Sequence, residues 1–370
     1  MLPLDANASV PVVPEARAAL LAALDDTSGN NPSSPHAGGR RARRRLDLAR
    51  DAVATAMGAA AKEVFFVAGA TEGNRFVVDL LIEHAFKIGR PLVVVSTPLE
   101  HPSLHKPLAR AHARGQLIVR QLPIHDGAVV VDHVDNDVDA VIATAAHNET
   151  GLIVDVEALG RALPAHAIFH VDAAQSLGRL GPPPARADIA VASAHKLGGV
   201  AGAGALVLRG RARALSLPWS GGGQEQGVRP GTEATAVICA FGAACAVVDD
   251  TRVAHRGLRA ARDRIEAAAV DAGATALVSQ HPRLDNTSAL LIPGVDGDAL
   301  RLLLDQAGVA VGFGAACSAL APEPSPGLMA LGLSGEDTRR VVRVSLAPGI
   351  SDLDVDDAAR KLVAVLKKLC

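Results

Sequence analysis

Short apolar runs alternate with longer amphipathic stretches through the first half of the chain. Seven runs rich in β-branched residues predict strands, at residues 63–69, 91–97, 116–122, 139–145, 167–173, 188–194 and 203–209. Several are apolar almost throughout, which is typical of strands covered on both faces. Helical patterns lie between many of them, for example over residues 71–86. This order predicts an α/β fold on a mostly parallel sheet.

The pattern changes after the glycine-rich segment 220–233. A helical region covers roughly residues 234–272, followed by short apolar runs and a helix at 297–308. The residues "SDLD" at 351–354 are a start signal for a last helix. This part of the chain predicts a smaller α+β unit.

Composition narrows the class of protein. A length of 370 residues favours two domains. A formal charge of -2 gives no overall attraction to nucleic acid or acidic membranes. Aromatic residues make up only 2%, which argues against a stacking surface for single-stranded nucleic acid. One strongly basic run, at 39–50, is best interpreted as a solvated helix face.

The lack of a recognisable signal peptide and the pattern of cysteines predict a cytoplasmic protein. No early apolar run is long enough for a signal peptide, and none reaches the length that spans a membrane. Cys239, Cys245, Cys317 and Cys370 form neither a disulfide framework nor a metal-binding pattern. We therefore expect a reducing cytoplasm and no metal.

One lysine stands in a suggestive place. Lys196 follows Ser-Ala-His at the end of a predicted strand, and it is either a solvated loop residue or an amine that forms a Schiff base. Asp172 ends the preceding strand, and ligands collect at the carboxyl ends of strands in α/β sheets. Pyridoxal phosphate needs such a lysine and a carboxylate at its pyridine nitrogen. The strand, turn and helix around Thr71 suit its phosphate.

The same residues carry a resemblance to a known family. "HVDAAQSLG" (170–178) with "SAHK" (193–196) resembles the NifS/IscS-type cysteine desulfurases, in the class V aminotransferase group of fold-type-I pyridoxal phosphate enzymes. Counterparts follow in order along the chain: "LDANASVPV" (4–12), "GNNPSSPHAGG" (29–39), "GATEGN" (69–74), "LEHPSL" (99–104), "HNETG" (147–151), "RPGTEAT" (229–235) and "GAACSALAPEPS" (314–325). The resemblance implies a seven-stranded large domain at 13–250 that binds the cofactor. It also implies a small domain made of 1–12 and 251–370.

The resemblance assigns roles position by position. Lys196 matches the Schiff-base lysine, Asp172 the partner of the pyridine nitrogen, and His101 the catalytic histidine that stacks on the ring. The other matched cofactor contacts are Ala70, Thr71, Asn148, Gln175, Ser193, His195 and, from the second subunit of an implied homodimer, Thr232. Asn148 also approaches the substrate, and Arg343 matches the arginine that binds the substrate carboxylate.

Cys317 separates the activities of this group. Small residues and prolines surround it, which is typical of an exposed loop. Without the lysine motifs it would be an ordinary loop cysteine; with them, the resemblance implies the nucleophile that takes sulfur from the substrate. Cys239 and Cys245 lie in an apolar helical stretch and are interpreted as packing residues, and Cys370 as incidental.

The implied reaction converts L-cysteine to L-alanine through a persulfide on Cys317. The sulfur would pass to an acceptor such as an iron–sulfur scaffold. Selenocysteine lyase, cysteine sulfinate desulfinase and aminotransferase activities remain alternatives, as does a non-enzymatic relative. The chain departs from the family pattern at Arg75, His147 and Ala315, among other positions.

Overall fold

The seven predicted strands form one sheet. The computed structural model describes residues 1–26, 31–131, 134–314 and 323–369. Within them, the larger sheet has the order β2-β10-β9-β8-β7-β3-β4. Its strands are β2 (Val64–Val67), β3 (Leu92–Ser96), β4 (Leu117–Gln121), β7 (Ala140–Thr144), β8 (Ile168–Asp172), β9 (Ile189–Ser193) and β10 (Gly204–Leu208). Neighbours from β4 to β9 run parallel, and only β10 runs against β9 and β2. The predicted mostly parallel sheet is confirmed.

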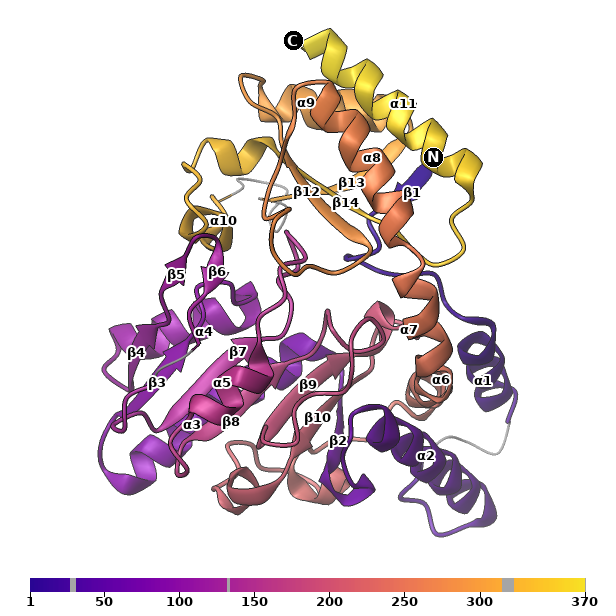
Figure 1. The fold of residues 1–370 in the computed structure, drawn as a ribbon. Helices are drawn as coiled ribbons and strands as arrows, with labels where there is room; N and C mark the ends of the chain where they lie inside the picture. The colour runs from indigo at the N-terminus through magenta and orange to yellow at the C-terminus, as the bar shows by residue number, and fades with distance from the viewer. Residues whose placement is uncertain (27–30, 132–133, 315–322, 370) are drawn as a thin grey trace.

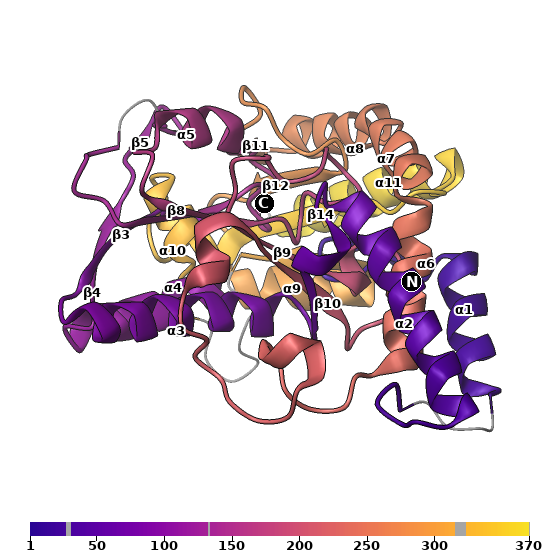
Figure 2. The same ribbon diagram turned by 90° about the horizontal axis from the view of Figure 1, so that it is seen from below.

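Helices cover both faces of this sheet, which explains the continuous apolar runs. In β2, Phe65 and Val67 pack into a core with α3 (Ala70–Ile88) and α4 (Pro102–Ala113). The alternate residues Val64 and Phe66 pack into a core with α2 (Ala37–Ala56) and α6 (Thr235–Ala246). Figure 2 shows α3 and α4 on one side of the sheet and α5 (Val156–Ala162) on the other.

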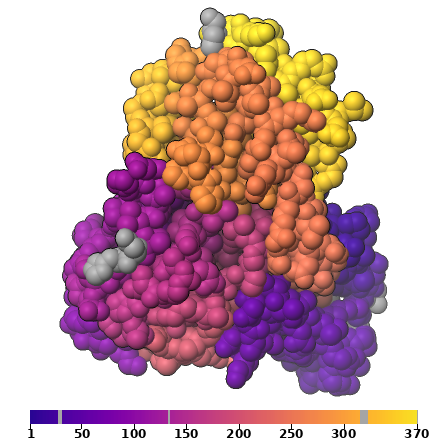
Figure 3. Space-filling model, viewed as in Figure 1, coloured from indigo at the N-terminus to yellow at the C-terminus, as the bar shows by residue number. Residues whose placement is uncertain are grey.

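A smaller sheet forms a second core. Its order is β1-β13-β14-β12-β11, so the first residues of the chain join strands from its last third. The strands are β1 (Leu2–Leu4), β11 (Thr275–Ala276), β12 (Thr287–Leu291), β13 (Val309–Phe313) and β14 (Val341–Ser345). The helices α8 (Arg259–Asp271), α9 (Gly297–Gln306) and α11 (Asp352–Leu369) pack on it. Figure 1 and Figure 3 show this orange and yellow part resting on the magenta part.

The boundaries of the two domains remain a prediction. The strands of the larger sheet lie within residues 64–208, and those of the smaller sheet lie at 2–4 and within 275–345. The helical region expected at 234–272 divides into α6, α7 (Val248–Arg256) and α8, with breaks at Val247 and Gly257. One of the short apolar runs that follow, at 276–280, is mostly turn, and Val278 within it has a positive φ of 49°. The remaining elements are α1 (Pro14–Leu24), α10 (Pro326–Ala330), β5 (Ile124–His125), β6 (Ala128–Val129), η1 (Ala61–Glu63), η2 (Ala194–Lys196), η3 (Gly210–Ala214), η4 (Gln224–Gly227) and η5 (Asp337–Arg340).

The basic run at 39–50 lies on α2 and is only partly solvated. Arg41 and Arg45 pair with Asp26. Arg50 instead turns inward, pairs with both carboxylate oxygens of Glu225 at 2.7 Å, and lies over the Phe66 ring. The expectation of a solvated face is wrong for Arg50, because its guanidinium has a buried carboxylate to pair with.

No helix in the described part of the chain is both long and apolar enough to cross a membrane.

Candidate active site

A cavity of about 890 Å³ lies where the two sheets meet. Its floor is the carboxyl edge of the larger sheet, where Thr144, Asp172 and Ser193 end β7, β8 and β9. The smaller sheet closes it with β13 and Arg343 of β14. The predicted residues that line it are Ala70, Thr71, His101, Asn148, Asp172, Gln175, Ser193, His195, Lys196 and Arg343. Chain segments far apart in sequence therefore converge on one site.

Of the predicted site residues that the structure describes, Thr232 does not line this cavity. Thr232 lines a separate cavity of about 190 Å³ together with Arg229 and Glu233. Its expected contact to the phosphate comes from a second subunit, so its role stays a prediction. Cys317 lies outside the described residues.

Lys196 is held at the cavity by the N-terminal segment. It follows β9 in η2, and its Nζ donates to the carbonyl oxygens of Asn7 at 2.5 Å and Ala8 at 2.8 Å. Burial lowers the pKa of Lys196 to about 8, and the nearby positive charges of Arg179 and Arg343 add to this effect. About half of this amine is therefore uncharged at pH 8 and a smaller part at neutral pH, and the uncharged form is the one that acts as a nucleophile or base.

Asp172 is fixed by donors to both of its carboxylate oxygens. The side chain of Asn74 donates to Oδ2 at 2.6 Å, and the backbone N–H of Ala174 donates to Oδ1 at 2.8 Å. Asn74 is buried in α3 and also contacts Ser103 and His170. These hydrogen bonds fix the orientation of the carboxylate at the cavity. Asn74 belongs to the "GATEGN" motif, but neither the strand-end pattern nor the resemblance assigns it a role.

His101 begins α4 as its N-cap residue. Its Nδ1 accepts a hydrogen bond from the backbone N–H of Ser103 at 3.1 Å and lies 2.8 Å from the Ser103 hydroxyl. Burial lowers the pKa of His101; Lys196 acts in the same direction and Asp172 against it. The imidazole is therefore neutral at neutral pH and carries its proton on Nε2, which is the form needed for proton transfer at the site.

The start of α3 has the properties of a phosphate cradle. Ala70 and Thr71 open this 19-residue helix at the cavity, so its free N–H groups and its dipole favour an anion there. Ser193, whose hydroxyl lies 2.9 Å from Nδ1 of His195, adds hydrogen-bonding capacity. Glu72 does not oppose the anion, because Arg229 pairs with it at 3.0 Å.

Arg343 reaches the cavity from the middle of β14, opposite Gly312 in β13. A Cβ at Gly312 would come within 2.6 Å of three guanidinium atoms, so only glycine leaves room for this side chain. Nη1 donates to the carbonyl oxygen of Asn148 at 3.0 Å, and Nη2 pairs with Asp5. A buried cation in a cavity suits an anionic group of a ligand.

The donor set fits pyridoxal 5'-phosphate. Lys196 would hold its aldehyde carbon, Asp172 its pyridine nitrogen, and the start of α3 with Ser193 and His195 its phosphate. Each of these groups lines the same cavity, and their chemistry matches the three ends of the cofactor.

Comparison with known proteins agrees with this fit. The family model described as "Aminotransferase class-V" matches residues 3–357. The chain belongs to the class V aminotransferase family. It is 31% identical to a cysteine desulfurase of Enterobacter agglomerans, over 99% of this chain and 92% of that protein.

Solved structures of the family show the same fold. A NifS-like protein superposes with a TM-score of 0.90 at 26% identity, over 100% of both chains. SspA in complex with cysteine superposes with a TM-score of 0.78 at 26% identity, over 94% of this chain and 99% of that one. The predicted resemblance, the fold class and pyridoxal 5'-phosphate as the cofactor are confirmed, since class V enzymes depend on this cofactor.

The residues that depart from the family pattern differ in their surroundings. Arg75 turns to Asp79 on the next turn of α3, with the shortest contact 2.6 Å, and this ion pair neutralises its charge beside the phosphate cradle. His147 is buried, with Nδ1 2.9 Å from the Thr150 hydroxyl, and burial lowers its pKa to about 3. Ala315 lies outside the described residues.

The cysteines of α6 are not placed for catalysis. Cys245 is buried and Cys239 half-buried, and burial raises the pKa of both thiols. Neither lines the cavity. Their interpretation as packing residues agrees with these positions, whereas Cys370 lies outside the described residues.

Proposed function

We propose that the protein is a pyridoxal phosphate-dependent cysteine desulfurase, which converts L-cysteine to L-alanine and passes the sulfur to its own Cys317. The observation that carries this proposal is one cavity that joins Lys196 and Asp172 with Arg343 of the other sheet. The first two suit the cofactor, and the third suits an amino acid carboxylate. The related proteins named cysteine desulfurase favour this activity over the other class V reactions.

Arg343 would bind and orient the substrate. Arg343 is 8% exposed and lines the cavity, so a carboxylate bound there is shielded from water and the pair is strengthened. Asn148, which lines the same region, would help to place the substrate. The α-carbon then lies between Arg343 and the lysine side of the cavity.

Lys196 would accept the α-proton. When bound, pyridoxal phosphate supplies an electron-withdrawing ring that stabilises negative charge at that carbon. With its pKa lowered to about 8, the amine of Lys196 can act as a base near neutral pH. His101, neutral and fixed by Ser103, is the second group that can move a proton here.

Cys317 would accept the sulfur as a thiolate. A bond forms between the Cys317 sulfur and the substrate sulfur, and the bond from the substrate sulfur to its β-carbon breaks. L-cysteine and the enzyme thiol together give L-alanine and a persulfide, so the balance needs no external oxidant or reductant.

Three finer features belong to this proposal. Thr232 would reach the phosphate of a second subunit in a homodimer, which is supported by its place outside the main cavity of its own chain. The persulfide sulfur would pass to an acceptor protein such as an iron–sulfur scaffold. The enzyme would work in the cytoplasm, where a reducing environment keeps the thiol free.

The deciding experiment uses the purified holoenzyme and L-cysteine. Alanine release is measured, and mass spectrometry locates the added sulfur. Cys317→Ser should keep its cofactor but yield almost no alanine or persulfide, since a hydroxyl cannot accept sulfur as a thiolate does. The matched control Cys239→Ser should keep turnover. Full turnover by Cys317→Ser, or a persulfide on Cys370, would refute the mechanism.

A further inference from the structure

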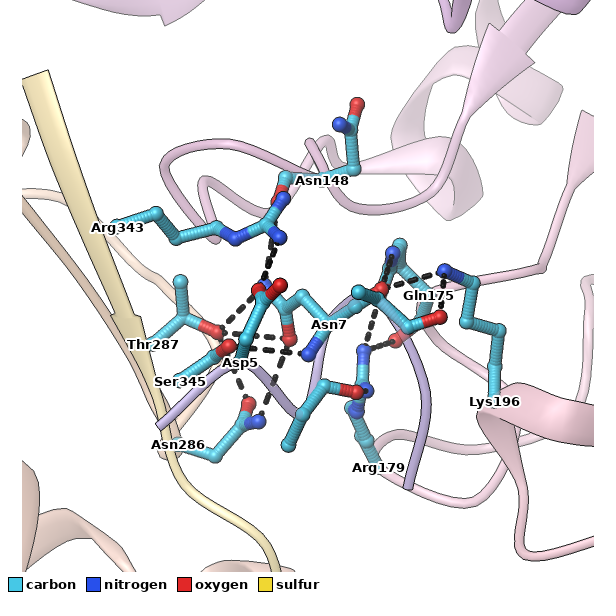
Figure 4. A network of polar contacts seen from close by, with 12 residues as sticks. Asp5, Asn7, Asn148, Gln175, Arg179, Lys196, Asn286, Thr287, Arg343 and Ser345 are labelled. Atoms are coloured by element: carbon cyan, nitrogen blue, oxygen red, sulfur yellow. Dashed lines mark hydrogen bonds and ion pairs between the residues drawn. The ribbon is translucent and has the colours of Figure 1, made fainter. Parts of the chain in front are cut away.

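The arginine expected to bind the substrate already holds a carboxylate of its own chain. Asp5 is the residue directly after β1, and its carboxylate forms an ion pair with Nη2 of Arg343. The Asp5 side chain is 31% exposed and lines the same cavity, whereas the Arg343 side chain is 10% exposed. Figure 4 shows the carboxylate of Asp5 beside the guanidinium of Arg343.

The geometry of the guanidinium makes this contact decisive. A carboxylate is bound with two parallel hydrogen bonds by either of two edges, Nη1 with Nη2 or Nε with Nη2. Nη1 is taken by the carbonyl oxygen of Asn148 at 3.0 Å, and Nε is buried without a partner among the described residues. Both edges include Nη2, where Asp5 sits. Because Nη2 has one N–H in each edge, a substrate carboxylate that binds with two hydrogen bonds must place an oxygen at Nη2 beside the carboxylate of Asp5, and the two like charges compete for it.

We propose that Asp5 is an internal occupant of the carboxylate site, and that the α-carboxylate of the substrate displaces it from Nη2 and gains Nε as a second donor. The exchange replaces one carboxylate with another, so the buried guanidinium keeps an anion throughout. Asp5 thereby lowers the affinity for ligands that bind Nη2 alone more than for ligands that bind both Nε and Nη2. It is a specificity-determining residue that acts through Arg343.

The same segment reaches the other end of the site. Two residues after Asp5, the Asn7 carbonyl accepts hydrogen bonds from Lys196 at 2.5 Å and from Gln175 at 3.0 Å. Its side chain is held by Thr287 of the smaller sheet at 3.0 Å. Asn7 is thus fixed on both sides (Figure 4), while the Asp5 side chain is more exposed and lies at the cavity. The exchange can therefore take place without moving the support of Lys196.

The inference rests on the proposed function for the identity of the substrate, but its test does not. Binding of 3-mercaptopropionate to the holoenzyme is measured by calorimetry, because this probe carries the carboxylate and thiol of cysteine without the amine. Asp5→Asn should tighten its binding about fivefold, by removing the competing charge. Asp5→Glu, which retains a carboxylate, should stay close to wild type, and so should Asp285→Asn, which removes a surface ion pair with Arg259.

Two further measurements separate exchange on Arg343 from other effects. Cysteamine, which lacks a carboxylate, should not bind more tightly to Asp5→Asn. In an Arg343→Gln background, Asp5→Asn should lose its effect, whereas a long-range charge effect would persist. Unchanged or weaker binding of 3-mercaptopropionate to Asp5→Asn overturns the inference.

Turnover gives an independent readout. The KM for L-cysteine should fall in Asp5→Asn with kcat within about twofold and cofactor content unchanged. A loss of kcat and cofactor together would instead indicate a purely structural role and overturn the inference. If no alanine forms from L-cysteine in any variant, the proposed function fails, while the binding comparison still decides the role of Asp5.

Discussion

The two sides of the cavity are built in different ways. On the side of the larger sheet, Asp172 and Lys196 stand at or just after the ends of neighbouring parallel strands, β8 and β9. On the side of the smaller sheet, Arg343 is brought to Asp5 and Asn148 across more than 190 residues of sequence. The first side follows from one local rule about strand ends, whereas the second exists only once two sheets have packed together.

We expect the largest loss of activity from a change on the side of the larger sheet. Lys196→Ala removes the amine that would hold the cofactor and accept the proton, so alanine release should fall about 10³-fold or more. The visible absorbance of covalently attached cofactor should also disappear, which a spectrum of the purified variant checks. Lys87→Ala, which removes a surface lysine that contacts Ser216, serves as the control. If borohydride still attaches the cofactor covalently to Lys196→Ala, another lysine holds the cofactor and this prediction is wrong.

On the side of the smaller sheet the effect should be on substrate binding. Arg343→Gln removes a buried cation from the carboxylate, so KM for L-cysteine should rise about 10²-fold. Cofactor content should stay normal, because no cofactor group depends on this side. Steady-state kinetics and the cofactor absorbance measure the two quantities, with the exposed Arg339→Gln as the control. Loss of cofactor with unchanged KM would contradict the division between the two sides.

A smaller effect should come from the support of Asp172. Asn74→Ala removes a 2.6 Å hydrogen bond to this carboxylate, and hydrogen bonds to charged groups contribute about 1.5–3 kcal/mol. Cofactor affinity should therefore fall about tenfold, with little change in KM. Titration of apoenzyme with cofactor measures the affinity. Asn136→Ala, in an exposed turn, is the control, and equal affinities for both variants would mean that Asn74 does not support the cofactor site.

The smallest effect concerns His147, a buried residue next to Asn148 of the cavity lining. Burial lowers its pKa in the folded protein to about 3, below the ordinary value of 6.5. The unfolded chain therefore binds a proton first as pH falls below 6.5, and the stability that neutral His147 contributes is lost between 6.5 and about 3. His147→Asn should reduce the slope of unfolding free energy against pH in this window by at most about 1.4 kcal/mol per pH unit.

Urea unfolding at a series of pH values measures this slope. Glu149, whose pKa burial raises to about 7, gives the opposite dependence, so the comparison with wild type isolates the histidine. His166→Asn, on the surface, should leave the slope as it is. An unchanged slope in His147→Asn would show that this histidine does not stay neutral in the folded protein.

The pattern of the sequence predicted the larger sheet well because its rules are local. Each of the seven apolar runs became a strand, since covered strands must be apolar on both faces. The same reasoning placed Asp172 and Lys196 at strand ends. The expectation of a solvated basic run was wrong for Arg50, which turns inward to Glu225. A basic run does not reveal a buried carboxylate elsewhere in the chain.

By itself, then, the sequence determined the class of fold, the family and the residues that suit the cofactor. Strand periodicity and ordered motifs are properties of consecutive residues. Only the tertiary structure decided what surrounds them: that Asn74 holds Asp172, that the carbonyls of Asn7 and Ala8 hold Lys196, and that Asp5 occupies Arg343. These four contacts join residues separated by 98 to 338 positions, and their distances and burial arise only when the chain has folded. No periodicity along the chain carries that information, because it is a property of the folded surface and not of neighbouring residues.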